Sequence, residues 1–122
     1  QAERVSIHDG GGSGVMADPL GLKTGAVVAA RMREIYGERV RGVFLYGHRA
    51  AGRAPRESDV ELLIVLDRIE RYGEELDRTS PVFASLSLEL GVVVGRVFVS
   101  EADWRDRTDG GLPGVRAEAV SL

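Results

Sequence analysis

Residues 46–66 read YGHRAAGRAPRESDVELLIVL, and this stretch decides the fold. An apolar strand ends at Gly47, a basic connection follows, and a second apolar strand opens with Asp59 and Glu61. Alternate side chains of a strand share one face, so we expect the two carboxylates to point the same way, with Cα atoms roughly 7 Å apart. Such a pair can hold divalent metal ions about 3.5–4 Å apart, as two-metal phosphoryl chemistry requires. The glycine turn would bring backbone N–H groups close to a triphosphate.

Length and composition set the class of protein. A chain of 122 residues has the length of one ordinary domain and should bury about 65% of the surface of its unfolded chain. The absence of cysteine excludes disulfides and thiolate metal sites. No apolar stretch approaches the roughly 20 residues of a membrane span, and no secretory signal is visible. We therefore expect a cytoplasmic protein without a membrane partner.

The charged residues also limit the class of partner. A net charge of −3 argues against general nucleic-acid binding, which usually needs a basic face. The positive charge is nearly all arginine, with Lys23 as the only lysine, and this is typical of genomic base composition. The alternative is arginine used to bind phosphate. Only the local cluster of Arg49, Arg53 and Arg56 supports that alternative.

The chain divides into a tail and one domain. Residues 1–17 contain the glycine-rich run GGGSG and are predicted to be a flexible linker. Residues 18–122 are predicted to be a single domain. Its first helix should begin at Asp18-Pro19, an N-cap residue followed by proline at the first helical position, and should end at Gly37.

The rest of the domain alternates between the two periodicities. Ser80-Pro81 is expected to end one helix and start another, and Gly95 to mark a bulge or a close approach of the backbone. The predicted elements are strands at 39–46, 59–66 and 92–99, helical segments within 69–90, a short helix at 100–104, and a helical turn or short strand at 115–120. This order favours an α/β (α+β) fold, in which helices pack against a small mixed β-sheet.

The central pattern resembles a known superfamily. Gly47-His48, ten intervening residues and then Asp59-Val60-Glu61-Leu62 are similar to the motif of the DNA polymerase beta-type nucleotidyltransferases. More narrowly, the chain looks like the minimal nucleotidyltransferases, which are bacterial single-domain proteins of this size. The similarity extends to residues 90–104 and 114–120, so it covers roughly the whole predicted domain.

The resemblance implies a nucleotidyltransferase fold and a reaction. A nucleoside monophosphate, AMP from ATP in the first instance, would pass to a hydroxyl acceptor with Mg²⁺ or Mn²⁺ as cofactor. In that scheme Asp59 and Glu61 are the catalytic metal ligands. Gly47 and His48 contact the β- and γ-phosphates, with Ser58 or Arg49 in support. The acceptor can be a tyrosine of a helical HEPN-type toxin, which would make the chain part of a toxin–antitoxin pair.

The sequence departs from the family pattern at two positions. The family usually has serine after the motif glycine, where this chain has His48; a protonated histidine could still assist an anion. The family's third carboxylate is expected on the next strand, at about the position of Val93. With two carboxylates, one metal ion is held less well and the proton acceptor for the attacking hydroxyl is missing.

Plainer interpretations stay open beside these. Asp59 and Glu61 could be a solvated strand entrance, His48 a turn residue, and the arginine cluster a solvated loop. The alternative function is a catalytically weakened binding module that acts as an antitoxin or regulatory partner. The sequence leaves open the nucleotide base, the acceptor and whether the chain forms a homo-oligomer.

Overall fold

The computed structural model describes residues 17–55 and 58–122. The predicted linker lies outside these residues except for Ala17. The elements in chain order are α1 (Pro19–Tyr36), the 3₁₀ helix η2 (Gly37–Arg39), β1 (Val40–Tyr46), β2 (Val60–Leu66), α2 (Tyr72–Leu90), β3 (Val94–Ser100), α3 (Glu101–Asp106), α4 (Leu112–Glu118) and β4 (Val120–Ser121). The predicted combination of helices with a small mixed sheet is confirmed.

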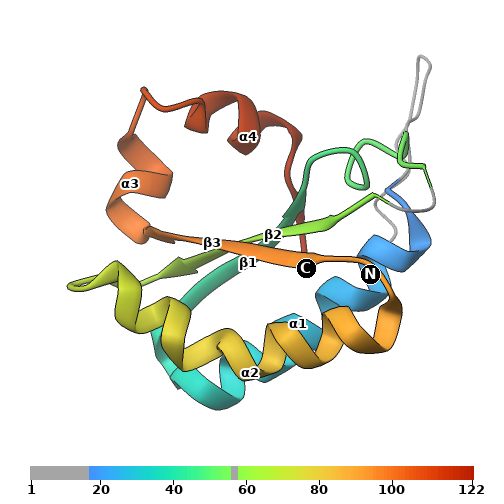
Figure 1. The fold of residues 1–122 in the computed structure, drawn as a ribbon. Helices are drawn as coiled ribbons and strands as arrows, with labels where there is room; N and C mark the ends of the chain where they lie inside the picture. Colours follow the sequence, from blue (N-terminus) through green and yellow to red (C-terminus); the bar gives the residue numbers. More distant parts are fainter. Residues whose placement is uncertain (1–16, 56–57) are drawn as a thin grey trace.

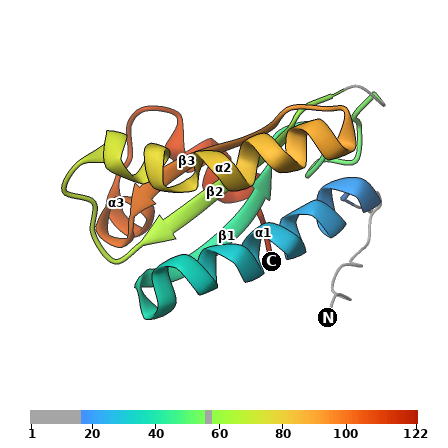
Figure 2. The same cartoon turned by 60° about the horizontal axis from the view of Figure 1, so that its bottom comes forward.

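The four strands form one sheet in the order β3-β2-β1-β4. β1 runs antiparallel to both of its neighbours, and β2 runs parallel to β3. Parallel neighbours need a crossover connection, which α2 provides. Helices α1 and α2 cover one face of the sheet, and α3 and α4 lie on the other (Figure 1). Figure 2 shows α1 and α2 side by side across the sheet.

Strand β2 is the centre of the core, as its unbroken apolar run predicts. Leu62 and Ile64 belong to the core cluster between the sheet and the helices α1 and α2. Leu63 is also buried but points to the opposite face, because side chains alternate along a strand. On that opposite face Phe44 of β1 packs against Trp104 of α3, with ring centroids 4.7 Å apart. Glu61 shares this second face with Leu63.

Helix α1 begins as predicted and packs very closely against its neighbours. The Asp18 side chain caps it by accepting a hydrogen bond from the Gly21 backbone N–H at 2.9 Å. A Cβ atom at Gly25 would run into the Leu122 side chain, so glycine there lets the helix and the end of the chain lie close together. Asp18 N donates to the Arg49 carbonyl oxygen at 2.8 Å, which attaches the start of the helix to the loop that follows β1.

The predicted break at Ser80-Pro81 is wrong, because α2 continues through Pro81. Proline removes one N–H from the helix ladder and usually ends or bends a helix. Here side chains bind the turn before it: Ser80 Oγ donates to the Leu76 carbonyl oxygen at 2.8 Å, and Arg96 Nη2 donates to the same oxygen at 2.6 Å. The bond from Arg96 is long-range, since Arg96 belongs to β3, and it supports the helix where the local signal predicts its end. Gly91 ends α2 in a left-handed conformation, as expected.

Strand β3 forms the edge of the sheet and is regular along its whole length. It pairs with β2 from Val94 to Ser100 without a shift in register, so the predicted bulge at Gly95 is wrong. Nothing lies within 4 Å of where a Cβ atom at Gly95 would stand, so no backbone approaches it closely either. On the outer side of the strand, Val94 N donates to Ser87 Oγ at 2.9 Å and Phe98 N donates to Tyr72 Oη at 3.1 Å.

The last part of the chain contains both of the alternatives predicted for residues 115–120. Helix α4 runs to Glu118, and β4 then adds to the free edge of β1. Arg116 of α4 donates from Nε to the Trp104 carbonyl oxygen at 2.6 Å, which ties α4 to the end of α3. Among the helices that the structure describes, none is both long and apolar enough to cross a membrane.

Candidate functional site

The predicted glycine turn and carboxylates meet where β1 ends and β2 begins. Tyr46 and Glu61 are paired residues of the two antiparallel strands. Gly47 follows with a backbone φ angle of +82°, a conformation that residues with a Cβ atom rarely adopt. A Cβ atom there would lie 2.7 Å from Glu61 Oε2. The turn therefore favours glycine at position 47, and the Glu61 carboxylate occupies the space that a side chain there would take.

Asp59 stands at the entrance to β2, one residue before the strand. It is exposed, while Glu61 is half-buried. The Val60 N–H donates to the Val93 carbonyl oxygen at 2.9 Å, which extends the ladder to this point. Because Asp59 and Glu61 are two residues apart in extended chain, they lie toward the same face of the sheet. This is the face that carries α3 and α4.

The loop between the strands starts as a tight turn. Ala51 N donates to the Gly47 carbonyl oxygen at 3.2 Å, and Arg53 N donates to that of His48 at 3.1 Å. His48 and Arg53 are exposed, so both side chains can be reached from solvent. Arg56, the third member of the predicted basic cluster, lies outside the described residues.

Arg49 is placed quite differently from Arg53. It is only 2% exposed. Its guanidinium binds Asp18 Oδ2 through Nη1 at 2.7 Å and the Ser58 carbonyl oxygen through Nε and Nη2 at 3.0 and 2.9 Å. Burial raises the pKa of the Asp18 carboxyl, but the Gly21 N–H and the Arg49 guanidinium outweigh burial and hold that pKa below its usual value. The carboxylate is therefore ionised at neutral pH and completes the pair.

The structure also shows which residue of β3 stands beside the carboxylates. Glu61 is paired with Gly95, not with Val93. Val93 precedes the strand and is 58% exposed. Because Val60 is paired with Val94, the same register places Val93, where the family's third carboxylate is expected, beside Asp59. Neither Val93 nor Gly95 provides a side-chain oxygen to a metal ion.

Two residues of this region are not among the predicted site residues. Tyr46 lies beside Glu61, and burial together with the Glu61 carboxylate raises the pKa of its hydroxyl. It therefore stays a neutral hydrogen-bond donor through the physiological range. Asp18 was predicted only as a helix cap, and nothing in the sequence pattern links it to Arg49, 31 residues away.

The carboxylate oxygens of the site are the type of ligand that a hard cation prefers, but the site has only two such side chains among the described residues. Asp59 and Glu61 provide carboxylate oxygens, the ligands that Mg²⁺ prefers. Within the described part of the chain, no group of three or more His, Asp or Glu side chains is placed to hold a metal ion. Mg²⁺ commonly keeps several waters and binds through one or two carboxylates plus substrate phosphates, so two carboxylates fit it.

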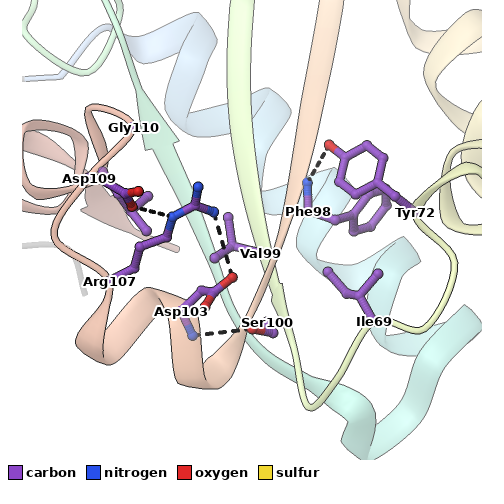
Figure 3. Close-up of a pocket in the computed structure, with 10 residues that line it drawn as sticks. Ile69, Tyr72, Phe98, Val99, Ser100, Asp103, Arg107, Asp109 and Gly110 are labelled. Carbon is purple, nitrogen blue, oxygen red and sulfur yellow. Dashed lines mark hydrogen bonds and ion pairs between the residues drawn. The ribbon is translucent and has the colours of Figure 1, made fainter.

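A pocket of about 440 Å³ lies at the opposite end of β3 (Figure 3). It includes Ser100, five residues beyond Gly95, which corresponds to about 16 Å along a strand. Its charged groups satisfy one another: Arg107 binds Asp109 at 2.6 Å and lies 3.7 Å from Asp103. Figure 3 shows Arg107 between these two carboxylates. The volume of this pocket therefore does not belong to the carboxylate site.

Comparison with known proteins adds no assignment. No model of a known protein family matches the chain, and no curated protein is significantly similar to it. The interpretation of the site therefore rests on its own geometry and on the resemblance of its motif.

Proposed function

We propose that the protein is a nucleotidyltransferase-fold enzyme that binds a nucleoside triphosphate with Mg²⁺ at the site formed by Gly47, Asp59 and Glu61. The observation that carries this proposal is that the Glu61 carboxylate lies in the space beside Gly47, 2.7 Å from where a Cβ atom at that position would stand. A turn that offers N–H groups to phosphate and a carboxylate that suits the accompanying cation are thereby brought to one point.

Each residue has a defined part in this proposal. The N–H groups at the start of the turn, at Gly47 and His48, would face the β- and γ-phosphates, because a helix-like turn directs its first N–H groups away from its own carbonyls. Asp59 and Glu61 would hold Mg²⁺, which when bound neutralises charge on the phosphates. The neutral Tyr46 hydroxyl beside Glu61 could donate to the nucleotide. The turn and the carboxylates together would orient the α-phosphate toward the acceptor, and positioning is the main requirement of phosphoryl-type transfer.

The acceptor that the resemblance implies is a protein hydroxyl, such as a tyrosine of a HEPN-type toxin. The nucleotide would most simply be ATP, with AMP transferred and pyrophosphate released. The exposure of Asp59 and His48 supports a large acceptor, because both side chains can be reached from outside.

One observation favours a second function. Glu61 has Gly95 as its neighbour on β3, and therefore no third carboxylate to accept the proton of the attacking hydroxyl. The alternative is a binding module that keeps the nucleotide site and acts as an antitoxin or regulatory partner without turnover.

Thermal unfolding tests the nucleotide site in both cases. A ligand that binds the native state stabilises it, by about 2.7 kcal/mol at a hundredfold excess over its Kd. We expect Mg²⁺-ATP to raise the melting temperature of the wild type but not that of Asp59→Asn or Glu61→Gln. Asp77→Asn is the matched control, since Asp77 is an exposed carboxylate on α2, on the other side of the sheet. If no triphosphate shifts the wild type, with either Mg²⁺ or Mn²⁺, the site does not bind nucleotide.

Labelled ATP then separates enzyme from binding module. The chain is mixed with a HEPN-type acceptor protein, and transfer of label is compared between the wild type and Asp59→Asn. Label on the acceptor that depends on Asp59 supports the enzyme. Nucleotide binding without transfer supports the binding module, and transfer that persists in Asp59→Asn contradicts the role proposed for this carboxylate.

A further inference from the structure

The Arg49 side chain joins parts of the chain that are far apart in sequence. It binds Asp18, the residue that caps α1, and the carbonyl oxygen of Ser58, at the end of the loop. The main chain adds a further link, since Asp18 N donates to the Arg49 carbonyl oxygen at 2.8 Å. The start and the end of the loop are thus both attached to the beginning of one helix.

This arrangement acts directly on the candidate site. The Ser58 carbonyl belongs to the same peptide group as the N–H of Asp59. Because a peptide group is planar and rigid, a hydrogen bond that holds the Ser58 carbonyl oxygen also fixes the position of the Asp59 backbone nitrogen. Arg49 itself follows Gly47 by two residues. The guanidinium therefore sets the separation between the glycine turn and the first carboxylate.

Because the Arg49 side chain is buried, its hydrogen bonds to Asp18 and Ser58 are costly to break. Arg49 is only 2% exposed, and burying a guanidinium without hydrogen-bonding partners would be very unfavourable. Loop conformations that separate Arg49 from Asp18 and Ser58 are therefore strongly disfavoured. Lysine could keep the charge but not the planar fork that places two N–H groups on one carbonyl oxygen.

We propose that Arg49 is a positioning residue of the candidate site, anchored by Asp18, and not a ligand of the phosphates. Its guanidinium holds Asp59 in register with Gly47, so the affinity of the carboxylates for a divalent cation depends on a residue that does not touch the cation. The consequence for the cation rests on the function proposed above, whereas the consequence for the loop does not.

Asp18→Asn is the sharpest variant for testing this role. Asparagine caps a helix as well as aspartate does, so α1 keeps its cap while the buried guanidinium loses its charged partner. Arg49→Lys is the second variant, and it removes the fork. The matched control is Asp67→Asn, which removes a carboxylate from another arginine: Asp67 Oδ1 lies 2.9 Å from Arg39 Nε, at the far end of β2.

Two measurements on the full chain decide the outcome. Amide signals of Gly47 and Asp59 in ¹H–¹⁵N NMR spectra report the loop, and Mn²⁺ titration followed by electron paramagnetic resonance reports the carboxylates. We expect Asp18→Asn and Arg49→Lys to move or broaden both amide signals. We also expect them to weaken Mn²⁺ binding about tenfold or more, as loss of a supporting shell does at metal sites. The control Asp67→Asn should lower the melting temperature and leave both readouts unchanged.

Other outcomes of the same two measurements would contradict the role proposed for Arg49. If Asp18→Asn and Arg49→Lys lower only the melting temperature, as the control does, Arg49 is a structural residue and the proposal is wrong. Should Arg49→Lys fail to fold, Asp18→Asn decides alone. If the wild type binds no Mn²⁺, the proposed function fails, and the amide signals then decide the role of Arg49: displaced signals support it and unmoved signals overturn it.

Discussion

Replacing Gly95 by aspartate should strengthen divalent cation binding at the candidate site. Gly95 is paired with Glu61 in the parallel register, and adjacent strands lie about 4.8 Å apart. A Cβ atom at position 95 meets nothing within 4 Å, and the backbone there is not left-handed, so the substitution fits without strain. The new carboxylate would stand beside that of Glu61, on the same face of the sheet.

The expected gain follows from Coulomb's law. A unit negative charge at about 5 Å from a divalent cation contributes about 1.7 kcal/mol in a dielectric close to that of water. This corresponds to about fifteenfold tighter binding, and salt screening reduces the gain. Without metal the added charge repels Glu61, so the metal-free variant should melt at a lower temperature than the wild type. With Mn²⁺ the order should reverse.

Isothermal titration with Mn²⁺ provides the measurement, and Val93→Asp provides the comparison. Val93 stands beside Asp59 instead of Glu61 and is 58% exposed, so solvent and salt should screen the same charge there more strongly and its effect should be smaller. The double variant Gly95→Asp with Glu61→Ala should lose most of the gain, because the two carboxylates act together. Tighter binding in Val93→Asp than in Gly95→Asp, or a full gain without Glu61, would refute the register argument.

Three further changes test other parts of the structure. Gly47→Ala should lower the free energy of unfolding by about 1–2 kcal/mol for the left-handed backbone alone, and a urea titration that matches wild type would contradict this. The variant should also lose the rise in melting temperature that Mg²⁺-ATP causes, because the new Cβ would meet Glu61. Tyr36→Phe removes the 2.6 Å hydrogen bond to buried Glu75 and should cost about 1–3 kcal/mol in the same assay. The pKa of the Asp18 carboxyl is lower in the folded chain than its unfolded value of 3.8, so this group stabilises the fold above that value and loses its contribution as the pH falls through the folded pKa. The wild type should therefore lose stability below about pH 4, and Asp18→Asn should lose less. Parallel acid unfolding curves of the two proteins would show that the Asp18–Arg49 pair is not linked to folding.

Local chemistry explains why much of the fold could be predicted. Asp18-Pro19 starts a helix, Gly91 ends one, and the apolar run of β2 indicates a central strand, because each signal depends on residues that are neighbours in sequence. The break predicted at Pro81 failed for the opposite reason. The helix is held there by Arg96, which comes from another strand and cannot be read from the local pattern.

At the candidate site, too, features set by neighbouring residues could be predicted and features set by distant contacts could not. The motif places Gly47, Asp59 and Glu61 correctly at one strand junction, since their spacing is set by a single loop. The neighbours of the two carboxylates on β3 depend on the register between strands separated by α2, which places Gly95 beside Glu61 and Val93 beside Asp59. The position of Arg49 depends on its pairing with Asp18, for which no sequence signal exists.

The outer edge of β3 has a consequence for how this molecule meets other proteins. An edge strand with unpaired N–H groups is a template to which a strand of another chain can add. Here Ser87 and Tyr72 of α2 each accept one of the outward N–H groups, at Val94 and Phe98. A partner strand would have to displace both side chains before it could pair. Two hydroxyl groups thereby oppose self-association through sheet extension at β3.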